Sequence, residues 1–205
     1  MKKRKFKISD IFFVVFIALL IIPQTRTPIQ VALNKLKVAV WSPSLNSVAN
    51  QNKVEPFGYR VTDIEGQTKN IAVGEDKVTF ISYWATWCPP CLAEMPSIQE
   101  LYKDYGDRIE FILLTLEDPE VVERFLNKKG YELPVYFPQM NTPEILSSKS
   151  IPTNYIIDAQ GSILIKETGA ADWNSKKVRI LLDGLLAEQG LNLARSHRNG
   201  DKRGS

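Results

Sequence analysis

Cysteine and histidine are scarce in this chain of 205 residues, which contains two cysteines and one histidine. A structural zinc site takes about four cysteine or histidine ligands, so these residues cannot form one. Haem attachment requires a histidine directly after the second cysteine, where the chain has Leu92. A catalytic cysteine–histidine pair is also excluded, because His197 lies in a polar tail that the composition predicts to be disordered. We therefore expect neither a metal nor another cofactor.

Long apolar runs are equally rare, and the one that stands out is Ile11–Ile22, which follows a basic cluster at residues 1–7. A helix of that length extends about 18 Å, less than the ~30 Å hydrocarbon core of a bilayer, as in a signal peptide. However, no small-residue cleavage site follows, and flanking lysines can lengthen a span by snorkelling. We expect an uncleaved signal anchor at residues 8–23 that leaves the rest of the chain outside the cytoplasm. A cleaved signal peptide and a buried core helix are the alternatives.

Residues 24–54 are expected to form a juxtamembrane segment and linker. Apolar residues recur between Ile29 and Trp41, so this part either lies along the membrane surface or packs on the following domain. The stretch from Ser42 to Val54 is polar and rich in turn-forming residues, which predicts a domain boundary there. The rest divides into one globular domain at residues 55–192 and a disordered polar tail at 193–205.

Basic residues are concentrated at the two ends of the chain, and the body between them has more acidic than basic residues. A nucleic-acid-binding domain has its basic surface on the fold itself. The charge distribution therefore argues against a nucleic-acid partner.

The globular part alternates between strand and helix patterns. Short strands at 57–63 and 70–73 flank the turn signal Glu65-Gly66 and predict an N-terminal β-hairpin. Apolar β-branched runs predict strands at 78–84, 109–116, 135–137, 153–158 and 163–167, and amphipathic patterns predict helices at 88–105, 118–129 and 175–189. This order predicts a three-layer α/β fold with a mixed sheet.

The two cysteines stand in Trp87-Cys88-Pro89-Pro90-Cys91, at the predicted junction of strand 78–84 and the following helix. A disulfide that closes so short a loop adds little stability, so a purely structural role is disfavoured. At the helix N-cap, unpaired N–H groups favour a thiolate on Cys88, and Cys91 lies one turn further on. The two prolines remove two of those donors and leave the N–H of Cys91 as the local donor. This pattern predicts a redox-active dithiol in which Cys88 attacks a substrate disulfide and Cys91 resolves the mixed disulfide.

Several separated stretches together resemble one family of proteins. They are Tyr83–Cys91, Glu94-Met95-Pro96, Ile151-Pro152-Thr153, Gly161 and Gly169-Ala170. From about residue 57 to 189 the chain resembles thioredoxin-fold proteins, in particular the membrane-anchored TlpA/ResA-like thiol-disulfide oxidoreductases. The resemblance implies a thioredoxin-like three-layer sandwich with an added N-terminal hairpin, preceded by a single membrane helix. It also implies that the catalytic domain lies on the periplasmic or extracytoplasmic side of the inner membrane.

The resemblance further implies which residues contact the substrate. Pro152 matches the cis-proline that faces the dithiol and orients the backbone of Ile151 toward a substrate strand. Trp87 is expected to cover the dithiol, and Pro89 and Pro90 complete the expected contact surface.

The proton acceptor for the second thiol is a separate question. Thioredoxins carry a buried aspartate six residues before the first cysteine, where this chain has Ser82, and serine is no base at neutral pH. Glu94 matches an acidic residue of the ResA-like group, so it is our candidate general base for Cys91. The alternatives are that Glu94 is a solvated helix residue and that water takes the proton.

We therefore expect an enzyme that reduces disulfides of extracytoplasmic proteins and receives electrons from a membrane-bound donor. A disulfide-forming oxidase of the same fold is one alternative, and a redox-inactive protein-binding module on the same scaffold is another. A peroxiredoxin is disfavoured, because the chain has Ile81 and Ala85 where the Pro-x-x-x-Thr-x-x-Cys pattern has proline and threonine.

Overall fold

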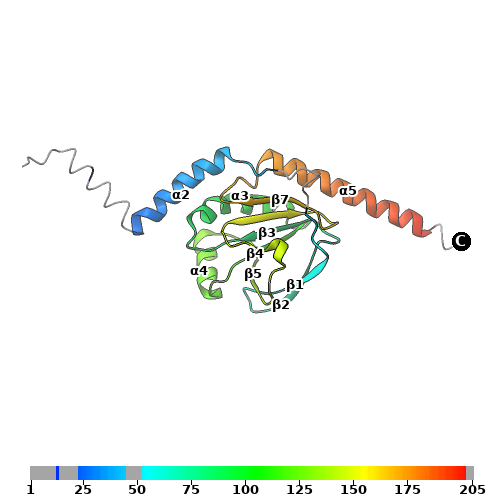
Figure 1. The fold of residues 1–205 in the computed structure, drawn as a ribbon, viewed down its shortest axis with the longest axis horizontal. Helices are drawn as coiled ribbons and strands as arrows, with labels where there is room; N and C mark the ends of the chain where they lie inside the picture. Colours follow the sequence, from blue (N-terminus) through cyan, green and yellow to red (C-terminus); the bar gives the residue numbers. More distant parts are fainter. Residues whose placement is uncertain (1–12, 14–22, 45–51, 202–205) are drawn as a thin grey trace, which may run out of the picture.

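The structure is a computed structural model that describes residue 13 and residues 23–44 and 52–201 (Figure 1). The basic cluster at 1–7 and the predicted signal anchor at 8–23 lie outside the described residues, apart from Phe13 and Pro23. Within the described ranges, no helix combines the length and apolar character needed to cross a membrane.

Seven strands form a single mixed sheet in the order β2-β1-β5-β4-β3-β6-β7. Their bounds are β1 Phe57–Asp63, β2 Thr68–Val73, β3 Thr79–Tyr83, β4 Glu110–Leu114, β5 Val135–Pro138, β6 Thr153–Ile157 and β7 Ile163–Thr168. The neighbours β3, β4 and β5 are parallel, whereas the other pairs are antiparallel. The predicted mixed sheet is thus confirmed, and the hairpin β1–β2 extends it at the β5 edge.

In the part of the chain that the structure describes, helices α2 to α5 and one short 3₁₀ helix accompany the sheet. They are α2 Pro23–Val40, α3 Pro89–Tyr105, α4 Pro119–Lys129, η2 Glu144–Leu146 and α5 Lys176–Asp201. The boundaries of α4 follow from the sequence as predicted. The Asp118 side chain accepts a hydrogen bond from the backbone N–H of Glu120, and Gly130 ends the helix with φ of 66°.

Helices α3, α4 and α5 contribute to one hydrophobic cluster on a single face of the sheet. Because β3, β4 and β5 are parallel and follow one another in the same direction, right-handed connections place α3 and α4 on the same side. The cluster on the other face contains strand residues together with Leu146 of η2. The expected third layer is therefore reduced to η2 and the neighbouring loop, in which Met140 packs on that cluster.

The C-terminal helix differs from the prediction. The sequence pattern predicts that it ends near residue 189 and that a disordered tail starts at 193, but α5 continues to Asp201. The low apolar content that indicates disorder does not prevent a helix, because leucine, alanine and arginine between 191 and 195 are good helix formers. In the structure, residues 193–201 continue α5.

Helix α2 lies against the domain, as one of the two alternatives for residues 29–41 predicts. Val38 is 9% exposed and packs with Ala93 of α3 and Ala170. Just beyond the helix, the indole N–H of Trp41 donates to Glu167 of β7 at 3.3 Å, and its carbonyl accepts from the N–H of Asp172 at 2.9 Å. The N-terminal segment is thereby attached to α3 and to the loop that precedes α5.

We predict that Val38→Asp releases α2 from the domain, because a buried aspartate has no partner in an apolar contact and the lost burial of valine costs roughly 1.5–3 kcal/mol. Trypsin cleavage at Lys35 and Lys37 is expected to become about tenfold faster in this variant. Leu36→Asp is the matched control, because Leu36 is 68% exposed on the same helix. Equal cleavage of both variants and the parent chain would contradict the docking.

Candidate active site

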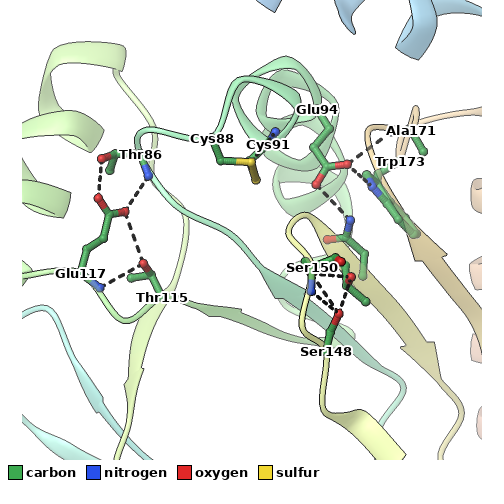
Figure 2. Close-up of a disulfide and its surroundings, with 12 residues drawn as sticks. Thr86, Cys88, Cys91, Glu94, Thr115, Glu117, Ser148, Ser150, Ala171 and Trp173 are labelled. Carbon is green, nitrogen blue, oxygen red and sulfur yellow. Dashed lines mark hydrogen bonds between the residues drawn. A yellow bond between two sulfur atoms is a disulfide. The ribbon is translucent and has the colours of Figure 1, made fainter. Parts of the chain in front are cut away.

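The two cysteines form a disulfide at the start of α3 (Figure 2), with an S–S distance of 2.09 Å and a Cα–Cα distance of 5.3 Å. Cys88 is the N-cap of the helix, and its Sγ accepts a hydrogen bond from the backbone N–H of Cys91 at 3.3 Å. The N-cap position and the local donor are as predicted, with Pro89 and Pro90 at the first two helical positions. Cys88 is 3% exposed and Cys91 is fully buried. A substrate therefore reaches Cys88 first.

The loop between β3 and the disulfide is held by a carboxylate that the sequence analysis did not identify. Glu117 accepts hydrogen bonds from the backbone N–H of Thr86 at 2.6 Å and from its hydroxyl at 2.7 Å. A third bond joins Thr115 Oγ1 to the same carboxylate at 3.4 Å. Figure 2 shows this group on the side of the disulfide away from Glu94. Glu117 thus fixes the approach of the chain to Cys88.

A second loop precedes β6 and carries the residues expected to present substrate. The peptide bond between Ile151 and Pro152 is cis, as the resemblance implies. Hydroxyl groups hold this loop, because Ser148 donates to the carbonyl of Ser150 at 2.9 Å and Thr153 donates to the same carbonyl at 2.8 Å. The carbonyl of Pro152 accepts from the N–H of Gly169 at 2.9 Å.

A groove lies beside the disulfide and is largely apolar at its rim. Its lining includes Tyr83, Trp87, Leu116, Met140, Thr142 and Ile151. Leu116 is 91% exposed and Trp87 is 67% exposed. Trp87 therefore lines the groove with a largely exposed side chain. Trp84, in contrast, is a core residue that packs on Phe125.

Glu94 is buried in the interior, not solvated on the helix surface. Its carboxylate accepts hydrogen bonds from the side-chain N–H groups of Asn154 at 3.0 Å and Trp173 at 3.1 Å, and from the backbone N–H of Ala171 at 3.3 Å. Burial raises the pKa of Glu94 to about 8, although these three donors oppose the rise. A carboxyl group with this pKa exchanges protons near neutral pH, one helical turn from Cys91.

Glu117, Asn154 and Trp173 are the site residues that the sequence analysis missed. A signal for Glu117 existed, because it comes three residues after the end of β4 and the carboxyl ends of parallel neighbours meet at one edge of a sheet. Asn154 follows Pro152 by two residues, but nothing local indicates its contact with α3. Trp173 lies 79 residues from Glu94, so only the tertiary structure joins them.

This fold, with a cysteine pair at the start of the helix after a central strand, defines the class of thioredoxin-like thiol-disulfide oxidoreductases. A model of the AhpC/TSA family matches residues 51–165. The thiol-disulfide oxidoreductase ResA of Halalkalibacterium halodurans is 32% identical over 118 residues, which cover 56% of this chain and 67% of the relative. The ResA of Oceanobacillus iheyensis is 30% identical over 142 residues, which cover 62% and 73%. The chain belongs to the AhpC/TSA family and, within it, to the ResA-like thiol-disulfide oxidoreductases.

The matched segment spans about two thirds of the length of several of these relatives, for example 65% of the ResA of Bacillus anthracis.

Solved structures are similar over a larger share of the chain. A secreted thiol-disulfide isomerase from Corynebacterium glutamicum has a TM-score of 0.53 and 15% identity, covering 72% of this chain and 91% of that one. A DsbF homologue from Corynebacterium diphtheriae has a TM-score of 0.52 and 19% identity, covering 70% and 93%. At these identities the likeness shows the fold alone.

We predict that Glu94 makes stability depend on pH. Because folding raises its pKa, the folded protein binds this proton more tightly than the unfolded chain. The stabilising contribution is therefore complete below the ordinary pKa near 4.5 and is lost as the pH rises through about 8. Relative to Glu94→Gln, the free energy of unfolding of the oxidised protein should fall by up to roughly 5 kcal/mol between pH 4 and pH 9. Denaturant titrations measure this difference, with Glu100→Gln on the same helix as the control; parallel pH profiles for all three proteins would contradict it.

We also predict that Glu117→Ala loosens the loop before Cys88, because two donors on Thr86 lose their acceptor. The expected loss of stability is about 1–3 kcal/mol, measured by denaturant unfolding, and disulfide exchange should slow several-fold. Glu117→Gln keeps one acceptor oxygen and should retain part of both properties. Glu123→Ala, an exposed position on α4, serves as the control. If Glu117→Ala behaves like the control, the loop does not depend on this carboxylate.

Proposed function

We propose that this protein reduces disulfides in extracytoplasmic proteins by thiol-disulfide exchange at Cys88 and Cys91. In the dithiol form, the Cys88 thiolate attacks one sulfur of the substrate disulfide, and a substrate thiolate leaves. Cys91 then attacks Cys88 Sγ, which forms the Cys88–Cys91 bond and releases the second substrate thiolate. Two electrons pass from the dithiol to the substrate. The observation that carries the proposal is the buried cysteine pair at the N-terminus of α3, with an open groove beside it.

The residues that line the groove favour a polypeptide as the substrate. Trp87 and Leu116 present large apolar surfaces to solvent, and the partly exposed Ile151 lines the same groove. Exposed apolar residues gathered at one place are typical of an interaction surface. We assign substrate contact to this groove, to the backbone of Ile151 before Pro152, and to Pro89 and Pro90 at the helix start.

Glu94 is our candidate for the proton acceptor of Cys91. Its burial, its position one turn along α3 and its raised pKa of about 8 support this role. A base of that pKa is matched to a thiol, whose ordinary pKa is about 8.5.

The compartment and the electron donor belong to the same proposal. The basic cluster and apolar run at residues 1–23 support a signal anchor in the cytoplasmic membrane, with the catalytic domain on the extracytoplasmic side. Each turnover leaves Cys88 and Cys91 oxidised, so a reductant must restore the dithiol. We propose a membrane-bound thiol donor for this step.

Two other functions use the same parts. A disulfide-forming oxidase differs only in its reduction potential, and a binding module would not use the cysteines at all. The pattern at Ile81 and Ala85 disfavours a peroxidase, although the family model includes AhpC in its name.

We predict that the parent chain catalyses insulin reduction by dithiothreitol and that Cys88→Ser abolishes the activity, because the remaining thiol of Cys91 is fully buried. Cys91→Ser should instead accumulate mixed disulfides with client proteins, because resolution is blocked.

The reduction potential of the Cys88–Cys91 pair should lie closer to that of thioredoxin, about −270 mV, than to that of DsbA, about −120 mV. A potential near the upper value would favour the oxidase, and an inactive parent chain with free thiols would favour the binding module.

A further inference from the structure

Two buried polar atoms beneath the disulfide have no protein partner. Ser82 Oγ and Asn154 Oδ1 are both inaccessible to solvent and make no hydrogen bond within the part of the chain that the structure describes. Ser82 and Asn154 are each fully buried. Buried polar groups in folded proteins nearly always find a partner, either in the protein or in an ordered water molecule.

The sheet brings these two side chains together. Ser82 of β3 lies directly opposite Asn154 of β6 in the antiparallel register, where Cβ atoms are about 4.5–5.5 Å apart. Both side chains face α3, because residues two positions away along each strand belong to the cluster on that face. Phe80 and Trp84 flank Ser82 in this way, and Ile156 does so for Asn154.

The same cluster contains the second thiol of the dithiol. Cys91 packs in it together with Phe80 and Trp84, the two neighbours of Ser82 on that face. Asn154 points its amide N–H toward Glu94 Oε1 at 3.0 Å, which leaves its Oδ1 free on the other side. Ser82, Asn154 and Glu94 therefore form a polar group under the first turns of α3, enclosed by apolar residues.

We propose that Ser82 and Asn154 bind one buried water molecule that carries the proton of Cys91 to Glu94. The water accepts the thiol proton while it gives one of its own protons to the Glu94 carboxylate. Cys91 thus becomes a thiolate, Glu94 becomes a neutral acid, and the water is unchanged. This inference rests on the proposed function, because it describes how Cys91 is activated for the resolving step.

The direction of the Glu94 carboxylate favours transfer through a water molecule over direct transfer from Cys91. Cys91 and Glu94 are three residues apart on α3, so their Cβ atoms are about 5–6 Å apart. The carboxylate of Glu94 is directed toward Asn154, Ala171 and Trp173 by its three hydrogen bonds. Ser82 offers a hydroxyl that donates and accepts, and Asn154 Oδ1 is a second acceptor, which together suit one water molecule.

A charged group also acts on Glu94. Glu167 of β7 is the charged residue whose proximity raises the pKa of Glu94, and it in turn accepts the indole N–H of Trp41. Helix α2 brings Lys37 close to Gly169, just beyond the end of β7. The groups that face the Glu94 carboxylate from β6 and from the loop before α5 are the neutral donors of Asn154, Ala171 and Trp173.

The test is the rate of the resolving step in single-turnover reduction of a fluorescent peptide disulfide by the reduced full chain. Ser82→Ala removes one ligand of the water, and we expect resolution to slow about tenfold or more, as for loss of acid–base catalysis. Ser82→Thr keeps the hydroxyl and should restore most of the rate. The initial attack by Cys88, measured in a Cys91→Ala background, should be unaffected by Ser82→Ala.

A proton inventory in mixed H₂O and D₂O gives a readout that a merely structural role would not change. A shuttling water moves two protons at once, so the parent chain should give a curved inventory and Ser82→Ala a linear one. Tyr155→Phe is the matched control, because Tyr155 lies next to Asn154 on β6 but carries its unpartnered hydroxyl into the opposite cluster. Thermal unfolding confirms that each variant is folded.

The possible results distinguish a failure of the proposed function from a failure of the water relay. If the parent chain fails to reduce the peptide disulfide, the proposed function is wrong. If the parent chain is active but Ser82→Ala resolves at the same rate with the same inventory, the water relay alone is overturned. If Glu94→Gln is also without effect on resolution, the proton does not go to Glu94.

Discussion

The start of α3 is the constraint on which the site depends. The helix begins where β3 ends at the middle of the sheet, so its first turn lies above the junction of β3 and β6. This position puts Cys88 at the N-cap, beside the groove, and Cys91 in the core. It also carries Glu94 over β6 and against the loop before α5. The nucleophile, the resolving thiol and the candidate base therefore all derive their environments from one helix.

A buried carboxylate is costly unless donors surround it, and Glu94 has three. The donors come from β6 and from the loop that precedes α5, so the site requires the complete C-terminal half of the domain. Even with these bonds, burial keeps the pKa well above that of an exposed glutamate. The same group thus affects folding stability and is the proposed proton acceptor, and perturbed pKa values of this kind are common at functional sites.

The family match covers a shorter part of the chain than the part that packs together in the structure. The family match covers residues 51–165, whereas α2 and α5 lie outside it. Both helices nevertheless contact the site region, α2 through Val38 on Ala93 and α5 through Val178 and Leu182 in the main cluster. The segment between the predicted anchor and the domain is thus a packed helix that reaches the neighbourhood of Glu94 through Ala93.

The sequence alone determined the strand and helix order, the mixed sheet, the N-cap position of Cys88 and the donor role of the Cys91 N–H. These features follow from local patterns, because periodicity, proline positions and cap residues act over a few residues. The tertiary structure decided whether Glu94 is solvated or buried and whether the segment at residues 29–41 packs on the domain. It also revealed the Ser82–Asn154 pair. Each of these depends on contacts between segments that are distant in the chain, and such contacts leave no local pattern in the sequence.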